Sequence, residues 1–192
     1  GVERAAVNSR RNVDRFAPVR TQRLRFTILA TNNLEPCLDE LEVFNLQGEN
    51  VALAKTGAVP TSSGDKLTAN RHELRFVNDG EYGNSRSWMS NETGRGWVEL
   101  TFAAEETIDR VDWGRDRQGK FSDRLATQYR IEVADGPEGW RTVADASDRK
   151  PFAGENQPAK FSEAGLSAEE AEAARRLMSE RRVLEARLND AA

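Results

Sequence analysis

The chain has 192 residues, 38% of them hydrophobic and 31% charged, and its formal net charge at pH 7 is −4. That hydrophobic content is enough for the core of one ordinary domain with an extension, which excludes a chain that is disordered throughout. The mixed-sign, mildly negative charge argues against a nucleic-acid-binding surface, and no apolar run approaches the roughly 20 residues of a membrane-inserted helix.

Residues 1–19 are polar and rich in arginine, and Pro18 closes the stretch. We interpret them as a linker. The start lacks the apolar segment of a signal peptide and reads as a cut from a longer protein.

Seven segments between residues 24 and 145 are predicted to be strands, because most of them alternate apolar with polar side chains. They are residues 24–29, 38–45, 50–55, 96–102, 108–113, 129–135 and 139–145. Residues 56–70 are rich in Gly, Ser, Thr and Pro and are predicted to form a long surface loop. With no helix between the strands, the pattern predicts an antiparallel β-sandwich.

The composition changes near Pro151. Residues 149–165 are predicted to be a second linker, and residues 166–190 a C-terminal α-helix. Ser167 and Glu170 have the spacing of a capping box, with Ser at the N-cap and Glu three residues later. The apolar stripe of this helix is narrow, so it either rests one face on the sandwich or a partner, or belongs to a coiled coil of the parent protein.

The fragments "VNDGEYGNSRSW", "GWVEL", "IDRVDWGRDRQGKFSDRLATQYRIEV" and "GWRTV", in this order, resemble the discoidin family, also called the coagulation factor 5/8 type C domain. The resemblance covers residues 20–148 and implies a galactose-binding-domain-like jelly roll. In many members the "ELEVF" strand closes the domain, whereas here residues 38–45 precede the Asp-Gly loop. Because the ends of a jelly roll lie close together, such a rearrangement leaves the sandwich intact.

The resemblance also implies a structural calcium ion beside the Asp79-Gly80 turn. Its ligands would be the carboxylates of Asp79 and Glu40, the carbonyls of Phe76 and Glu81, and a side chain such as Ser85. Asn84 and Ser87 are alternatives to Ser85, because the loop is about two residues longer than in common members. Calcium takes six to eight oxygens in irregular geometry, which suits such a loop.

The alternative for this loop needs no metal: Asp79 forms an Asx turn, and Trp88 packs in the core beneath it. In either case we expect Asp79 and Glu40 to converge. Two carboxylates brought together repel unless a cation compensates them, so the sequence predicts either calcium or an arginine such as Arg75 or Arg86.

A second candidate site is the charged loop over residues 113–124. Arginine and aspartate side chains can bind sugar hydroxyls, sulfate or carboxylate. The predicted ligand-binding residues are Arg86, Arg115, Asp116, Arg117 and Arg124. Arg95, in a loop expected at the same end of the sandwich as Arg86, would join such a face. The alternative is an internal network in which these arginines pair with nearby aspartates.

The chain is therefore predicted to be a non-catalytic module that binds a glycan, within a larger extracytoplasmic protein that is periplasmic, at the cell surface or secreted. The alternative is a structural spacer that packs against neighbouring domains of its parent. The single cysteine, Cys37, excludes an internal disulfide. An enzyme is not expected, because no Ser-His-Asp order can be built around the single histidine, His72, and no phosphate loop or zinc cluster is present.

Overall fold

The computed structural model describes residues 3–136 and 139–154, together with residues 167, 170, 172, 173, 176, 177 and 180. The chain divides into two compact units, residues 1–155 and residues 156–192. In the described part of the chain no helix is both long and apolar enough to cross a membrane.

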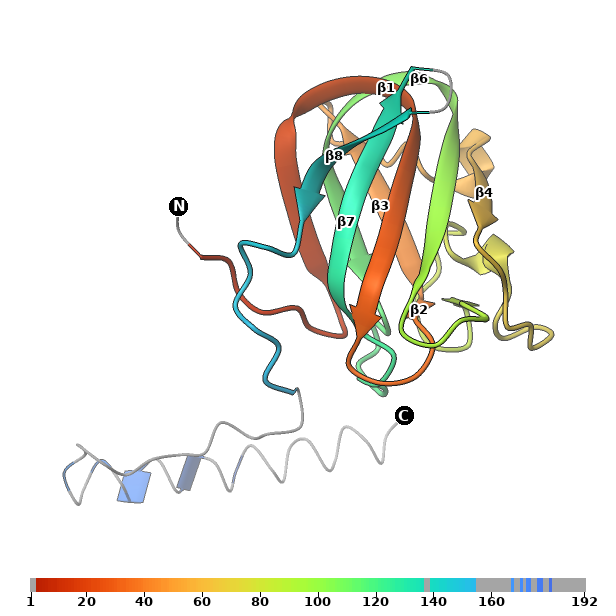
Figure 1. Ribbon diagram of the computed structural model, residues 1–192. Coiled ribbons are helices and arrows are strands. Elements are labelled where there is room, and N and C mark those ends of the chain that lie inside the picture. The colour runs from red at the N-terminus through yellow and green to blue at the C-terminus, as the bar shows by residue number, and fades with distance from the viewer. Residues whose placement is uncertain are drawn as a thin grey trace. The chain divides into compact units, whose positions relative to one another are not determined.

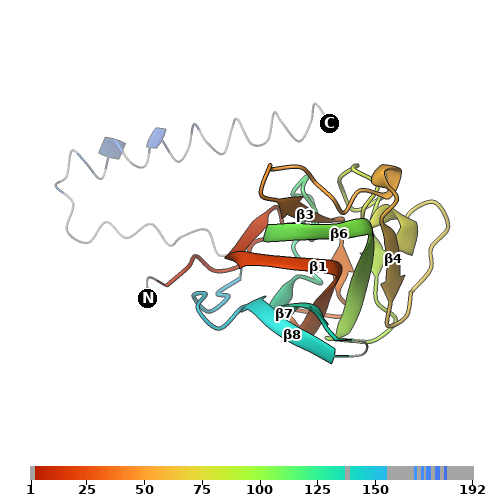
Figure 2. The ribbon, with the colours of Figure 1, turned by 90° about the horizontal axis from the view of Figure 1, so that it is seen from above.

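The first unit is an antiparallel, sandwich-like β fold (Figure 1). Its strands are β1 (Asn12–Thr31), β2 (Cys37–Leu38), β3 (Glu40–Asn45), β4 (Val59–Ser62), β5 (Trp88–Met89), β6 (Gly96–Gly114), β7 (Ala126–Asp135) and β8 (Gly139–Asp145). The main sheet has the order β3-β6-β1-β7-β8, with β4 also paired to β6, as Figure 2 shows from above. Strands β2 and β5 form a separate pair, and two short 3₁₀ helices, η1 (Ala54–Thr56) and η2 (Leu74–Phe76), interrupt the loops.

Strands β1 and β6 are long and pair along most of their length, but the two halves of β1 have different neighbours. The second half pairs with the start of β6 and also with β7, whereas the first half pairs with the end of β6, which in turn pairs with β3. The register shifts between Arg15 and Val19 and again between Thr21 and Arg23. Such irregularities let one strand pass from one layer of a sandwich to the other.

The predicted linker over residues 1–19 is wrong for residues 12–19, which lie in β1. The pattern was hidden because the buried side chains of this half-strand, Asn12 and Asp14, are polar. Pro18 falls inside the register shift, where β1 needs no ladder hydrogen bond. The strand predicted over residues 50–55 is also wrong, since those residues form a turn followed by η1.

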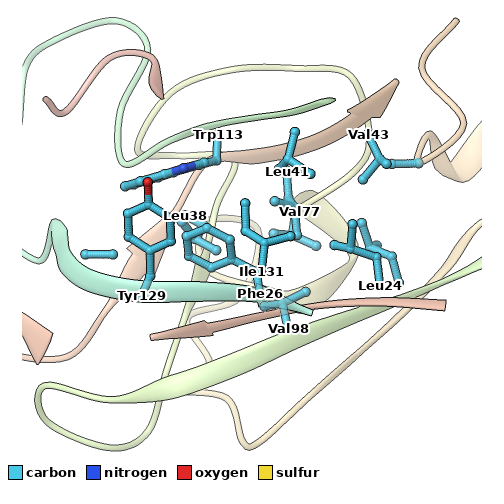
Figure 3. Packing of buried hydrophobic residues seen from close by; sticks show 14 of the residues in the cluster. Leu24, Phe26, Leu38, Leu41, Val43, Val77, Val98, Trp113, Tyr129 and Ile131 are labelled. Carbon is cyan, nitrogen blue, oxygen red and sulfur yellow. The ribbon is translucent and has the colours of Figure 1, made fainter. Parts of the chain in front are cut away.

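The core lies between the two layers and is centred on three aromatic rings (Figure 3). Phe26, Trp113 and Tyr129 lie with their ring centres 5.0–5.1 Å apart. Leu24, Leu41 and similar side chains, which alternation predicted to face inward, are fully buried. Trp88 is also buried, as predicted, and its indole Nε1 donates to Asp65 Oδ1 at 2.7 Å.

One carboxylate is buried at the end of this aromatic group. Asp14 is fully buried and accepts hydrogen bonds from Trp113 Nε1 at 2.9 Å and from the Tyr129 hydroxyl at 2.7 Å. Its charge is compensated by the guanidinium groups of Arg4 and Arg149. A buried carboxylate is tolerated only when its oxygens are paired in this way.

The two arginines join the ends of the domain. Arg4 also bonds to Asp148 through side chain and backbone, and its carbonyl accepts the amide of Lys150 at 2.9 Å. The compact fold therefore runs from Arg4 to Lys150, past both predicted boundaries at residues 20 and 148.

In the second unit, Ser167 and Glu170 form the predicted capping box. The backbone amide of Ser167 donates to Glu170 Oε2 at 2.8 Å, and the amide of Glu170 donates to Ser167 Oγ at 3.3 Å. The described residues from Glu170 to Glu180 have helical backbone. The remainder of the predicted helix over residues 166–190, and residues 155–165 of the predicted linker, lie outside the described residues.

We expect Asp14→Asn to lower the free energy of unfolding by about 3–5 kcal/mol, the usual cost of breaking a buried ion pair by removing one partner. The substitution leaves Arg4 and Arg149 without their common counter-ion. Urea denaturation measures the loss. Asp135→Asn, at an exposed aspartate in the same domain, is the matched control and should change stability by less than about 0.5 kcal/mol.

Candidate functional site

The Asp79 loop folds against β3. Glu40 is fully buried, and its Oε1 accepts the backbone amide of Gly80 at 3.0 Å, so the predicted convergence of Glu40 with the Asp79-Gly80 turn is observed. Asp79 forms the Asx turn of the metal-free alternative, since its Oδ1 accepts the amide of Glu81 at 2.8 Å. Its other oxygen, Oδ2, is ion-paired with Arg86.

Arginine is thus the cation that the structure places beside these carboxylates. The Arg86 guanidinium also lies 3.3 Å from Glu81 and stacks on the ring of Phe76, with 4.2 Å between the guanidinium carbon and the ring centre. Arg75, the other candidate, instead pairs with Glu73 at 2.6 Å.

The predicted calcium ligands do not fit an ion as they lie here. Both Asp79 oxygens are taken by protein donors, and Ser85 is exposed at the surface. Within the described ranges, no group of three or more His, Cys, Asp or Glu side chains converges as a metal site. Three buried oxygens near this loop have no hydrogen-bond partner: Asp39 Oδ1, Glu40 Oε2 and Asn78 Oδ1. The sequence predicted either calcium or an arginine beside these carboxylates, and the Asp79–Arg86 pair favours the arginine. A melting experiment distinguishes the two.

Burial raises the pKa of Glu40 to about 9. The hydrogen bond from Gly80 opposes the shift, and the negative charges of Asp79, Glu42 and Asp39 add to it. At neutral pH Glu40 therefore carries a proton, which avoids burying a negative charge beside the other carboxylates.

The charged loop over residues 113–124, which was predicted to bind a ligand, is mostly held in internal hydrogen bonds and ion pairs. This is the arrangement of the alternative interpretation. Arg115 is only 2% exposed, and its guanidinium binds Asn84 Oδ1 at 2.7 Å and Asp123 Oδ1 at 2.9 Å. Asp116 is fully buried and accepts the backbone amides of three loop residues, Gln118, Lys120 and Phe121. Neither side chain is accessible to a ligand.

The other predicted ligand-binding arginines are paired as well. Arg117 pairs with Glu42, and Arg124 lies 3.3 Å from Asp123 and 3.7 Å from Glu35. With Arg86 held by Asp79, the five predicted residues do not form an open ligand face.

The single histidine and the single cysteine lie close together, but both are buried. Ser87 Oγ donates to the Asn84 carbonyl at 2.9 Å and is contacted by His72 Nδ1 at 2.8 Å and Cys37 Sγ at 3.4 Å. Burial, with nearby arginines, lowers the pKa of His72 to about 4, and burial raises the pKa of Cys37. A neutral histidine and a protonated thiol without solvent access make a packing group rather than a nucleophile.

The surface feature that the sequence interpretation missed is a groove of about 530 Å³ beside Trp97. It is lined by residues 27–31 of β1, by Ser63 and by residues 92–97. Trp97 is half-buried and is the register partner of Thr27, on the face opposite the buried Phe26 and Val98. The signal in the sequence was this tryptophan on the polar side of an alternating strand.

The Trp97 ring is held from one side. The guanidinium carbon of Arg25 lies 4.5 Å from the centre of the Trp97 ring and 4.1 Å from that of Trp140. Glu99, nearly buried, accepts hydrogen bonds from Arg25 at 2.9 Å and from Arg23 at 2.8 Å. Along β1, Arg25 precedes the Thr27–Trp97 pair, and the other β1 residues that line the groove, 28–31, follow it. A ligand in the groove would therefore approach Trp97 from the side opposite Arg25.

Comparison with known proteins found no relative of this chain. No family model matches the chain, and no curated protein and no solved structure matches it. The resemblance to the discoidin family therefore stays a prediction.

We expect the melting temperature to be unchanged by EDTA or by added calcium, because Arg86 already compensates Asp79. Differential scanning fluorimetry in both conditions measures this. A melting temperature that falls on chelation in the natural chain, but not in Asp79→Ala, would show that calcium occupies the loop.

We also expect Glu40→Gln to gain stability relative to the natural chain as pH rises from 5 to 9. In this window the unfolded chain has lost the Glu40 proton while the folded chain retains it, so ionisation favours the unfolded state. Glutamine keeps an acceptor for Gly80 and does not titrate. Denaturant unfolding of both proteins at pH 5, 7 and 9 checks the trend, and a difference that does not vary with pH contradicts it.

Proposed function

We propose that this chain is a non-catalytic carbohydrate-binding module and that its ligand lies in the groove beside Trp97. The observation that supports this most directly is the half-buried tryptophan lining a concave surface. Small-ligand sites are typically concave and aromatic, with a few polar groups that fix the orientation of the ligand.

The groove has the chemistry that a sugar requires. The ring of Trp97 offers an apolar face for the C–H groups of a pyranose, and Leu29, exposed at the groove, extends that apolar surface. Hydroxyl side chains line the groove as well. Ser63 and Thr93 can donate to sugar hydroxyls, whereas Thr27 and Thr31 can only accept, because their protons are donated to Glu132 Oε2 and to the Leu34 carbonyl. The clamp from Arg25 fixes the ring in advance, which lowers the ordering cost of binding.

A structural spacer is the second candidate, and one observation favours it. The charges of the loop over residues 113–124 are largely satisfied internally, as expected if this end of the domain does not bind a soluble ligand. In that case the module would position the neighbouring domains of its parent.

We also propose that the first unit is a discoidin-like jelly roll and that a C-terminal helix follows it. The antiparallel pairing supports a discoidin-like jelly roll, and the capping box at Ser167 supports a helix over residues 166–190. An extracytoplasmic parent protein would give such a module access to glycans.

We expect Trp97→Ala to abolish glycan binding while leaving the fold intact, because the side chain is not part of the buried core. A glycan array followed by isothermal titration calorimetry measures the loss. Phe121→Ala removes an exposed aromatic outside the groove and should bind as the natural chain does. A natural chain that binds no glycan on the array would support the spacer instead.

A further inference from the structure

Resting on the proposed function, we infer that the groove selects acidic sugars. Arg95 binds the carboxylate of a uronic acid while the sugar ring lies against Trp97. Arg95 and Trp97 lie in one short segment, residues 92–97, which lines the groove.

Arg95 is the one basic side chain among the residues that line the groove, all of which are described. Its side chain is 74% exposed, and its nearest carboxylate is Glu92, 3.6 Å from Arg95 Nε and beyond hydrogen-bond distance. Glu92 approaches the Nε edge, so the two terminal nitrogens remain to donate hydrogen bonds to a carboxylate. The other arginines predicted for a ligand face differ in this respect, because their guanidiniums are tied to internal partners: Arg86, Arg115, Arg117 and Arg124.

The loop that carries Arg95 is fixed before any ligand arrives. Ser90 is fully buried; its Oγ donates to the Arg95 carbonyl at 2.9 Å and accepts the Glu92 amide at 3.1 Å. Gly94 is in the left-handed region, with φ of +74°, and its amide donates to the Leu34 carbonyl at 3.0 Å.

Gly96, between Arg95 and Trp97, packs closely against Ser90. A Cβ on Gly96 would lie 2.6 Å from Ser90 Oγ, so only glycine lets the loop pack this closely. Ser63 then fixes Trp97, since Ser63 Oγ accepts the Trp97 amide and the Ser63 amide donates to the Trp97 carbonyl, both at 3.0 Å. The arginine and the aromatic ring are therefore presented together by a rigid segment.

The acidic residue in the groove, Glu92, provides a second variant that distinguishes acidic from neutral sugars. Glu92 is the one carboxylate among the lining residues, and it repels an acidic ligand while serving a neutral one as a hydroxyl acceptor. Removing its charge should therefore strengthen binding of an acidic sugar and not of its neutral counterpart.

The test uses the full chain and a matched pair of probes, oligogalacturonate and its fully methyl-esterified form. Isothermal titration calorimetry at low salt should give an affinity for the acid at least about tenfold higher, because the ester cannot form a charge-assisted pair with arginine. Raising the salt concentration should narrow this difference.

Three variants assign the effect. Arg95→Gln should remove the preference for the acid and keep binding of the ester, Glu92→Gln should increase the preference, and Trp97→Ala should abolish binding of both probes. Arg141→Gln changes the net charge by the same amount at an exposed position on β8 and should leave the preference unchanged.

Equal affinity for the acid and its ester, or a preference that persists in Arg95→Gln, would overturn the inference while the proposed function stands. Hexaglutamate binding as tightly as the acidic sugar would also overturn it, since charge alone would then suffice. If neither sugar probe binds and the glycan array is negative as well, the proposed function itself fails.

Discussion

The fold depends on one buried carboxylate. Asp14 joins the indole of Trp113, the hydroxyl of Tyr129 and two arginines that come from opposite ends of the domain. A charge at this depth is tolerated only when its partners are in place. The aromatic core around Asp14 is therefore stable only when the two chain ends, which carry Arg4 and Arg149, are joined. Asp14 is one of several anchors of residues 3–11, together with the buried side chain of Val7 and the Ser9 carbonyl, which accepts the amides of Arg115 and Asp116.

The same arrangement recurs on the outer faces of the sheet. Two carboxylates of β6, Glu99 and Asp112, are buried, and each pairs with two arginines. Glu99 pairs with Arg23 and Arg25 of β1. Asp112 pairs with Arg11 and, within β6 itself, with Arg110. The guanidiniums lie at the surface and the carboxylates beneath them. The arginines around these two carboxylates are therefore used in internal pairs.

This internal pairing explains where the candidate site lies. The charged loop over residues 113–124 attracts attention in the sequence, but its arginines hold the loop to the domain. The groove beside Trp97 carries fewer charges, and those it has, on Glu92 and Arg95, are more than hydrogen-bond distance apart. The proposed site therefore lies beside a cation without a hydrogen-bonded carboxylate rather than in the loop where cations are most numerous.

The sequence by itself determined the strands of residues 24–29, 96–102, 108–113, 129–135 and 139–145, the inward side chains along them, the core position of Trp88 and the capping box at Ser167. These features follow from local periodicity and from short-range hydrogen bonding, both of which are properties of neighbouring residues. Only the tertiary structure decided that residues 12–19 belong to the sheet. Their buried residues are polar, and Asp14 finds its aromatic partners, Trp113 and Tyr129, 99 and 115 positions away. The tertiary structure likewise decided that Arg86 rather than Arg75 meets Asp79, that Arg115 is buried, and that Arg95 and Trp97 share a groove with β1. Which charged groups pair depends on distances set by the packing of remote segments, and no local pattern encodes those distances.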